Sequence, residues 1–271
     1  MQRKFTLGLA TGMLAALLTV SSSVSAQNSA TDDIAKYREM IADGNPSELY
    51  EAAGEDLWKK PAGPKNATLE KCDLGLGPGV VKGAAAQLPR YFKDTNKVQD
   101  LESRILTCME RLQGYDPKEI ISAGFEKGKR KDVEAIVAYV VTAAKGHTIN
   151  ISTKHPKEKE MYQMGKYAFY FQGGPMDFSC ASCHGEDGKR IRLQDLPNLI
   201  EQKGAALGYG AWPAYRVSSG NFWTMQRRLN DCYRQQRFPE PIYTSDVTIA
   251  LQVFMGANGN GGKMNTPGLK R

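Results

Sequence analysis

The 271-residue chain has few of the residues that usually bind metals, with only three histidines and five cysteines. It has no basic tract interleaved with aromatic residues, which argues against a nucleic-acid partner. Beyond the first 26 residues, no uncharged apolar run approaches the roughly 20 residues of a membrane-spanning helix, so we expect no membrane span in the mature protein. With nucleic-acid binding and a membrane span disfavoured, the cysteines and histidines are the residues most informative about function.

The N-terminal segment has the pattern of a secretory signal. Arg3 and Lys4 form a basic start, an uncharged apolar run extends from Phe5 to Val20, and small residues precede a cleavage point after Ala26. We therefore expect residues 1–26 to be a signal peptide that directs the protein to the periplasm, an oxidising compartment. Its removal lowers the formal net charge from +7 to +5, a modest excess that suits small anions or an acidic protein partner.

The strongest chemical signal is Cys180-Ala181-Ser182-Cys183-His184, a C-x-x-C-H motif typical of covalent haem attachment. On a short helical turn the two thiols reach the two vinyl groups of one porphyrin, and the adjacent histidine ligates the iron. A thioredoxin-like redox pair would need a βαβ context, and a zinc site would need a second pair of ligands, and the sequence has neither. We therefore predict one haem c, bound through Cys180 and Cys183 with His184 as an iron ligand.

Two parts of the sequence resemble each other, which predicts an internal repeat. Apolar periodicity predicts four helices, at Lys97–Gln113, Lys131–Ala144, Asn221–Gln236 and Ser245–Met255. An overlay of the two parts matches Arg104 and Cys108 with Arg228 and Cys232, and sets Gln113-Gly114 against Arg237-Phe238.

The same overlay sets Cys72 against Cys180, but Leu74, Gly75 and Leu76 stand where the rest of the haem motif would be. We predict a mainly α-helical protein of two cytochrome-c-like domains, residues 27–150 and 151–271. The first is expected to be a haem-less copy and the second to bind the haem. The stretch Thr148–Lys157 would join them.

The repeat also divides the remaining cysteines. With no haem between them, Cys72 and Cys108 can close a disulfide, which would stabilise the first domain by about 2–4 kcal/mol. Cys232 is then left alone in the haem-binding domain, where a lone cysteine is most often an inert core residue. Arg228 lies one helical turn before it on the same face, and further positive charge nearby would favour the thiolate, the nucleophilic and metal-binding form; it comes from Arg227, Arg234 and Arg237.

Other side chains could ligate the iron of an ordinary electron carrier. Met225, Met255 and Met264 are rival candidates for the sixth ligand of the iron, although a methionine is more often a core or surface residue than a ligand. His147 and His155 lie in the other copy or in the linker and are weaker candidates.

Taken together, the C-x-x-C-H motif, the Arg228–Cys232 pair and the degenerate first copy make the chain similar to the SoxA family, the larger c-type cytochrome subunits of the bacterial thiosulfate-oxidising Sox system. The resemblance spans essentially the whole mature chain. Some members carry a haem in both copies. The departure at Leu74, Gly75 and Leu76 makes this chain resemble the single-haem type, whose first domain is held by a disulfide.

The resemblance implies an L-cysteine S-thiosulfotransferase that works as a heterodimer with a small cytochrome, SoxX. Thiosulfate would be joined oxidatively to a cysteine of the carrier protein SoxYZ, with electrons leaving through the haem to an electron-accepting cytochrome c. His184 and Cys232 would be the axial iron ligands, with Cys232 also the sulfur-handling nucleophile through a persulfide. Arg228 would bind thiosulfate, because a guanidinium donates paired, charge-assisted hydrogen bonds to an oxoanion.

Three other functions remain open on the residues alone. A plain electron-transfer cytochrome would use methionine or histidine as sixth ligand, and a haem sensor or structural subunit would have no turnover. A thiosulfate dehydrogenase would couple two thiosulfates to tetrathionate. Its usual members carry two haems, whereas this chain has one motif.

Overall fold

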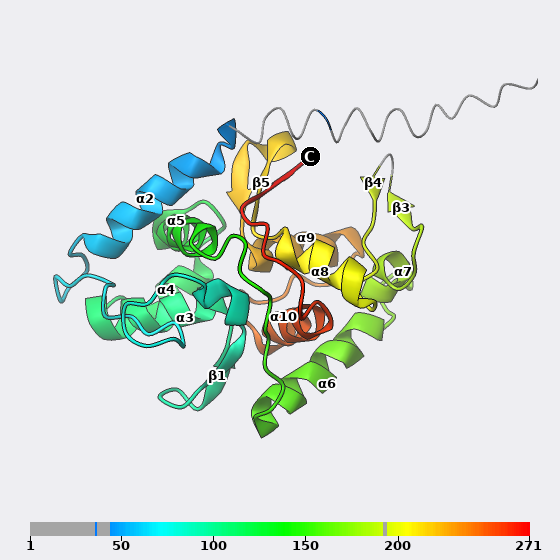
Figure 1. Ribbon diagram of the computed structural model, residues 1–271, viewed down its shortest axis with the longest axis horizontal. Helices are drawn as coiled ribbons and strands as arrows, with labels where there is room; N and C mark the ends of the chain where they lie inside the picture. Colours follow the sequence, from blue (N-terminus) through cyan, green and yellow to red (C-terminus); the bar gives the residue numbers. More distant parts are fainter. Residues whose placement is uncertain (1–35, 37–43, 192–193) are drawn as a thin grey trace, which may run out of the picture.

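The computed structural model describes residues 36, 44–191 and 194–271, and this part of the chain is mainly α-helical, as predicted (Figure 1). The predicted signal peptide lies outside the described residues. The helices that position the site and the core are α2 (Ser47–Lys59), α3 (Leu101–Cys108), α4 (Pro117–Ser122), α5 (Gly128–Thr142), α6 (Pro156–Tyr170), α7 (Cys180–His184), α8 (Gln202–Gly210), α9 (Met225–Gln235) and α10 (Asp246–Asn258), with the short turns η2 (Ala84–Gln87), η3 (Met109–Gln113) and η4 (Val217–Ser219).

Short strands connect these helices. In one hairpin β1 (Arg90–Phe92) pairs antiparallel with β2 (Lys97–Gln99), and in another β3 (Arg190–Ile191) pairs with β4 (Gln194–Asp195). The remaining strands form a three-stranded sheet around β5 (Ala214–Arg216), which pairs antiparallel with β6 (Asn221–Trp223) and parallel with β7 (Gly268–Lys270). All of them are too short to make a sheet core, so helices supply the core.

Each half of the chain contains a pair of helices that cross through a glycine. Gly54 of α2 meets α5, and Gly165 of α6 meets α10; a Cβ at either position would lie 2.0 Å from a carbonyl oxygen, that of Ala135 or Ala250. Only glycine lets the two backbones approach this closely. Figure 1 shows α2 with α5 at the upper left and α6 with α10 below and to the right. The same crossing in both halves supports the predicted repeat.

The buried apolar residues form two clusters that follow the two halves of the chain. One runs mainly from Trp58 to Ala144, and the other mainly from Ile149 to Met264. Each also takes residues from the other half: Phe222 and Tyr243 join the first cluster, and Ala86 and Val98 join the second. The two halves therefore pack closely against each other, and the division at residue 150 stays a prediction.

The stretch predicted to join the halves alternates at its start, where Thr148 and Asn150 are exposed and Ile149 and Ile151 are buried. Ile149 and Ile151 are 1% and 2% exposed. The backbone of this stretch is bonded to both halves, because Asn150 N donates to Ala86 O at 2.8 Å and Ile149 N donates to Gly262 O at 2.8 Å.

The two amphipathic helices begin later than the periodicity predicts. Their first residues form the strands β2 and β6, and α3 and α9 begin at Leu101 and Met225. The capping residues Asp100 and Thr224 separate strand from helix, since the side chain of each accepts a hydrogen bond from the backbone three residues on. The strands exist because β1 and β5 pair with them, which helical periodicity does not reveal.

The predicted alignment of the two helix ends is wrong by one residue. From Lys97 to Cys108 each residue has its counterpart 124 positions later, but η3 is a π-helix, whose wider turn contains one additional residue. The helices end at Gly114 and Arg237, which both have left-handed backbones with φ of 80° and 61°. Gly114 therefore corresponds to Arg237, not to Phe238.

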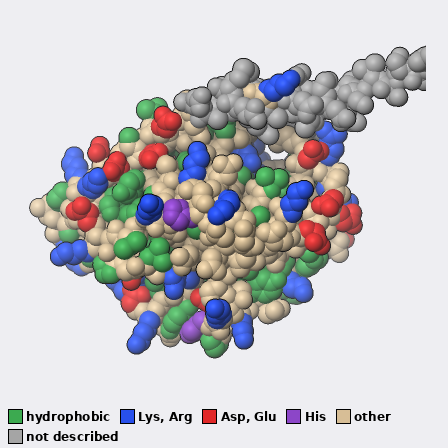
Figure 2. Space-filling model, viewed as in Figure 1, with side chains coloured by type: hydrophobic (Ala, Val, Ile, Leu, Met, Phe, Trp, Pro, Cys, Tyr) green, Lys and Arg blue, Asp and Glu red, His purple; other side chains and the backbone are tan. Residues whose placement is uncertain are grey.

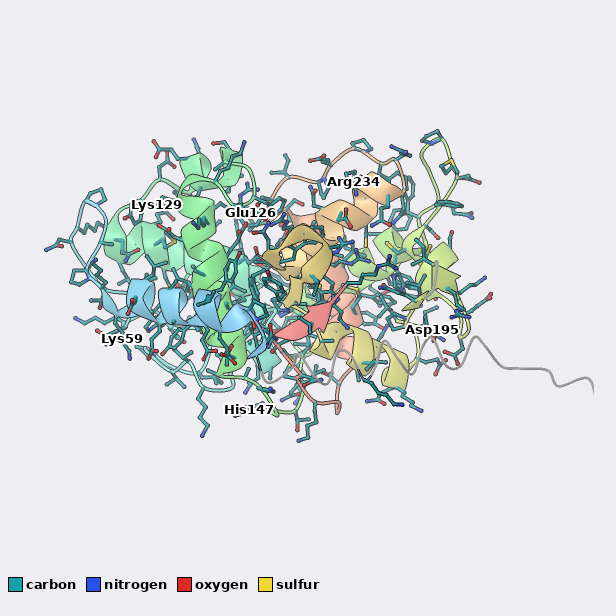
Figure 3. All side chains as sticks on the ribbon, turned by 90° about the horizontal axis from the view of Figure 1, so that it is seen from above. Lys59, Glu126, Lys129, His147, Asp195 and Arg234 are labelled. Carbon is teal, nitrogen blue, oxygen red and sulfur yellow. A yellow bond between two sulfur atoms is a disulfide. The ribbon has the colours of Figure 1, made fainter. Side chains whose placement is uncertain are left out.

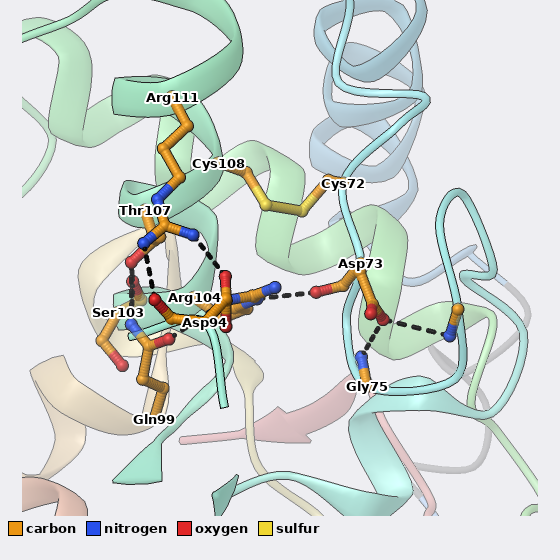
Figure 4. The surroundings of a disulfide bond; sticks show 11 residues. Cys72, Asp73, Gly75, Asp94, Gln99, Ser103, Arg104, Thr107, Cys108 and Arg111 are labelled. Atoms are coloured by element: carbon orange, nitrogen blue, oxygen red, sulfur yellow. Dashed lines mark hydrogen bonds and ion pairs between the residues drawn. A yellow bond between two sulfur atoms is a disulfide. The ribbon is translucent and has the colours of Figure 1, made fainter. Parts of the chain in front are cut away.

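Cys72 and Cys108 form the predicted disulfide, with their Cα atoms 5.6 Å apart (Figure 4). The residues after Cys72 form a loop, in which Asp73 Oδ1 accepts hydrogen bonds from the backbone of Gly75 and Gly77 at 2.7 and 3.0 Å. Cys72 and Leu74 are each 1% exposed. Each copy of the repeat forms one structural unit. Apolar side chains and the disulfide thus fill the first unit at the position that corresponds to the haem motif of the second unit.

The surface agrees with a modest excess of positive charge. Figure 2 shows Lys and Arg side chains scattered over the visible face and interspersed with Asp and Glu. Within the described ranges, no helix has both the length and the apolar character that a membrane crossing requires.

Candidate functional site

The residues of the C-x-x-C-H motif lie on α7, a single helical turn. Ser179 begins it: its Oγ accepts a hydrogen bond from Ser182 N at 3.2 Å, and Ser182 Oγ accepts one from Ser179 N at 3.0 Å. Such a reciprocal capping box stabilises a turn that is too short to persist by itself. It thereby holds Cys180, Cys183 and His184 close together.

The imidazole of His184 is oriented by a backbone carbonyl. Its Nδ1 lies 2.9 Å from Pro197 O, and because a carbonyl oxygen only accepts, Nδ1 carries the proton and Nε2 is the nitrogen available to a metal. Burial lowers the pKa of His184 and the charge of Arg228 lowers it further, against the opposing effect of the Pro197 hydrogen bond. The neutral, metal-binding form is therefore favoured.

Helix α9 places Arg228 and Cys232 near α7. Gln236, at the end of α9, donates from Nε2 to Cys180 Sγ at 3.9 Å. Burial raises the pKa of Cys180 to about 12, and the nearby Cys232 adds to the increase. The contact of Gln236 with Cys180, and the charge effects of Cys232 on Cys180 and of Arg228 on His184, place α9 beside α7.

A buried carboxylate that the sequence analysis did not identify lies beside Arg228 on α9. Asp231, with a side chain 7% exposed, forms ion pairs with Arg216, Arg228 and Arg234. Burial by itself would raise the pKa of Asp231, but the hydrogen bond from Arg234 and the charges of Arg228 and Arg216 bring it below its ordinary value. Arg228 and Arg234 lie three residues before and after Asp231 on one helix face, and this spacing could have indicated both of them as its partners.

The positive charge around Cys232 is arranged differently from the prediction. Arg234 is paired with Asp231, and Arg227 forms an ion pair with Glu126 of the first unit. Figure 3 shows Glu126 and Arg234 on the same side of the molecule. Of the arginines on α9, Arg228 is thus the one whose charge reaches both the buried carboxylate and His184.

The rival ligands have other surroundings. Met225, Met255 and Met264 are 8%, 6% and 3% exposed and belong to the apolar cluster of the second half. His155 caps α6 and stacks on Tyr91 with ring centroids 3.7 Å apart. His147 lies on the opposite side of the molecule from Arg234 in Figure 3.

The residues around α7 fit a covalently bound haem. Cys180 and Cys183 are on one turn, and neither is in a disulfide within the described part of the chain. Cys180 and Ala181 pack against the apolar cluster of the second half, which suits an uncharged thioether. The carbonyl of Pro197 leaves Nε2 of His184 for the iron.

Comparison with protein families identifies the first unit independently of any haem motif. A family model described as SoxA/TsdA, cytochrome c domain, matches residues 53–149. This range contains the disulfide and lacks C-x-x-C-H. The half without the motif is therefore also a cytochrome c domain, as the repeat predicted.

Two curated relatives cover nearly the whole chain. The sequence is 60% identical to the L-cysteine S-thiosulfotransferase subunit SoxA of Hydrogenophilus thermoluteolus, over 95% of this chain and 97% of the relative. It is 36% identical to a subunit of the same name from Hydrogenobacter thermophilus, over 92% of each.

Among solved structures, the crystal structure of SoxXA from P. pantotrophus matches with a TM-score of 0.72, covering 87% of this chain and 84% of that one. The two sequences are 21% identical, so this likeness supports the fold.

Proposed function

The chain belongs to the SoxA family of L-cysteine S-thiosulfotransferase subunits, and we propose that α7 and α9 of its second unit form the active site. In this proposal Cys232 handles the sulfur and Arg228 binds thiosulfate. The observation that carries it is the proximity of Arg228 and Cys232 to the haem motif residues Cys180 and His184.

The cofactor of a SoxA-type cytochrome is haem c, and we propose that this chain binds one. Cys180 and Cys183 would hold it by thioethers, and His184 and Cys232 would be the ligands of its iron. The haem, when bound, supplies an acceptor for electrons, and a thiolate ligand is expected to lower its potential relative to the thioether of a methionine ligand. The single C-x-x-C-H motif and the disulfide in the first unit support a count of one.

The reaction joins thiosulfate to a thiol of a carrier protein. A sulfur–sulfur bond forms between the terminal sulfur of thiosulfate and the cysteine sulfur, the thiol proton is released, and two electrons leave. The sulfur of Cys232, as thiolate or persulfide, would first be joined to the terminal sulfur of thiosulfate as the two electrons leave. The carrier thiolate would then attack that terminal sulfur, take the S2O3 group and release Cys232 in its starting form, because thiolates attack sulfur–sulfur bonds readily. Arg228 would hold the sulfonate oxygens with charge-assisted hydrogen bonds during this transfer.

The expected partners follow from the family. We propose a heterodimer with a SoxX cytochrome, the SoxYZ carrier as sulfur acceptor and a cytochrome c as electron acceptor. We also propose that the protein is exported to the periplasm with cleavage after Ala26, for which the N-terminal sequence pattern is the support.

The alternative functions make different demands on the same residues. An electron-transfer cytochrome would need a methionine or a histidine at the iron. Here Met225, Met255 and Met264 are core residues, and His155 caps α6. A thiosulfate dehydrogenase would also use cysteine ligation, and it would release tetrathionate without requiring a carrier thiol. Product analysis with and without the carrier separates these reactions.

Replacing Cys232 by Met tests the proposal. We expect haem to stay attached, because the thioethers are on α7, while the optical spectrum changes and the potential rises. Thiosulfate-dependent conjugation to the carrier should fall by at least about 1,000-fold, because the nucleophile is gone. Pyridine haemochrome assays should give one haem per chain for both proteins.

Met255→Leu is the matched control, because it replaces a rival ligand by a side chain of similar volume that cannot bind iron. It should leave the spectrum and the conjugation rate unchanged. A Cys232→Met protein with the wild-type spectrum and turnover would show that Cys232 is a structural thiol, and a spectrum altered only by the Met255 substitution would favour the electron carrier.

A further inference from the structure

One carboxylate, that of Asp231, holds three arginine side chains at the α9 side of the proposed site. Asp231 Oδ2 accepts from Arg228 Nη1 at 3.1 Å and from Arg216 Nη1 at 3.2 Å. Oδ1 accepts from Arg234 at 2.6 and 3.2 Å, and Gln235 Nε2 donates to Oδ2 at 2.7 Å. With five donors, the carboxylate has no capacity left to bind substrate or to exchange a proton, so its role is structural support of the arginines.

The arrangement of Arg228 shows what this support achieves. Asp231 engages only Nη1, and among the described residues no hydrogen bond engages Nε or Nη2 of Arg228. The Trp212 ring lies 5.5 Å from the guanidinium carbon, within the range of a cation–π contact. The group is thus held at one nitrogen and over one ring, and its Nε–Nη2 edge remains for a ligand. This edge is the planar fork that matches two oxygens of an oxoanion.

Arg216 comes to the same carboxylate from a different element. It is on β5, where its Nε donates to Arg271 O at 3.0 Å and its guanidinium carbon lies 4.2 Å from the Trp223 ring centroid. One carboxylate among three guanidiniums leaves this cluster with a net positive charge, opposite in sign to the charge of thiosulfate.

We propose that Asp231 is a positioning residue for thiosulfate binding, which holds Arg228 by Nη1 so that its Nε–Nη2 edge faces the oxoanion. This inference rests on the proposed function of Arg228. Asp231 acts through Arg228 and does not touch the substrate.

The direction in which Asp231→Asn changes KM for thiosulfate distinguishes a positioning role from a simple effect of charge. Asp231→Asn removes a negative charge, so if the carboxylate merely diluted the positive field, thiosulfate would bind more tightly. The proposal requires the opposite result. We expect KM for thiosulfate to rise by about tenfold or more, the range for loss of a charge-assisted hydrogen bond, with kcat, haem content and optical spectrum nearly unchanged. Asp231→Glu, which restores the charge, should recover much of the affinity.

The assay uses the full chain in its complex with the cytochrome partner, with the carrier protein as acceptor. Glu126→Gln is the matched control, because it also unpairs an arginine of α9, Arg227, and it should leave KM unchanged. In the double variant Asp231→Asn/Arg228→Ala, KM should equal that of Arg228→Ala alone, because Asp231 acts through Arg228.

The outcomes distinguish this inference from the proposed function. If Arg228→Ala raises KM while Asp231→Asn leaves it unchanged or lowers it, or if the two effects add, the positioning role is wrong and the function stands. If Arg228→Ala itself has no effect on KM, the proposed role of Arg228 fails. Should Asp231→Asn not incorporate haem, the same cycle with Asp231→Ala, which also removes the carboxylate, decides the question.

Discussion

Arg104 and Arg228 occupy the same position in the two units and have different surroundings. Arg104 is 5% exposed, donates from Nε to Asp73 O at 2.6 Å and pairs with Asp94 at 2.9 Å (Figure 4). Its guanidinium carbon also lies 4.0 Å from the Phe92 ring centroid. The side chain of Arg228 is 24% exposed and keeps one edge unbonded within the described residues. The same position of the repeat thus has a structural role in the first unit and a proposed binding role in the second.

Matched lysine substitutions at these two positions should have opposite effects. Arg104→Lys should lower the free energy of unfolding by about 1–3 kcal/mol, because lysine cannot satisfy the partners of a buried planar fork. Its KM for thiosulfate should be unchanged. Arg228→Lys should preserve stability and raise KM severalfold, because a point charge replaces the fork only in part.

Urea unfolding and conjugation kinetics on both variants measure these effects. A stability loss for Arg228→Lys equal to that for Arg104→Lys would mean that Arg228 is also a structural residue.

At the scale of the elements, the two helix crossings define the repeat more clearly than the sequence does. α2 packs on α5 and α6 on α10 through Gly54 and Gly165, while α3 and α9, the helices of Cys108 and Cys232, differ by the extra residue of η3. The two helix crossings have no room for a side chain at their glycines. The segment after α3 accommodates an additional residue, because Gly114 ends the helical turns with a left-handed backbone.

We predict that Gly54→Ala and Gly165→Ala each lower the free energy of unfolding by about 1–3 kcal/mol, as overpacking does. The reason is that the new Cβ would lie 2.0 Å from a backbone oxygen, which cannot move without separating the helices. Gly44→Ala is the control, since a Cβ there has nothing within 4 Å. Urea unfolding of the three variants measures the effect, and equal stability for Gly165→Ala and Gly44→Ala would contradict the crossing.

At the scale of the whole molecule, buried polar groups join the two halves beside the start of α9. Asp100 Oδ2 accepts from Gln226 and Gln252 at 2.6 Å each, and Glu102 accepts from Gln226 N at 3.0 Å and from the Tyr243 hydroxyl at 2.7 Å. Burial raises the pKa of Glu102 from 4.5 to about 8, the Asp100 charge adds to the increase, and the hydrogen bonds partly oppose it. Packing of the halves therefore favours a protonated Glu102.

This network predicts how stability depends on pH. Because its pKa is raised on folding, Glu102 contributes stability that is fully present below pH 4.5 and is lost as pH rises through about 8. Glu102→Gln mimics the protonated form and should remove this loss. Relative to wild type, the variant should gain on the order of a few kcal/mol between these pH values.

Unfolding by urea across this pH range measures the difference. Glu48→Gln on α2, an exposed position, should follow the wild type. Glu134, whose pKa burial raises to about 7, leaves a residual pH dependence in every variant. Parallel curves for wild type and Glu102→Gln would show that Glu102 stays ionised in the folded protein.

The sequence by itself determined the features that depend on local spacing or on counting. The C-x-x-C-H motif predicted how Cys180 and His184 share one turn, and the repeat predicted the pairing of Cys72 with Cys108, because each of these follows from a few covalently linked positions. It also predicted the helical class, since amphipathic periodicity is strong in long segments. The axial role of Cys232 and the binding role of Arg228 stay predictions.

Only the tertiary structure decided the features that join distant residues. The strands β2 and β6 replace predicted helical turns because β1 and β5 pair with them, and the π-turn of η3 moves the alignment by one residue. Pro197 reaches His184 and Arg216 reaches Asp231 across loops whose course no periodicity encodes. A buried carboxylate gains its partners from the way helices and strands pack, so its surroundings exist only once the chain has folded.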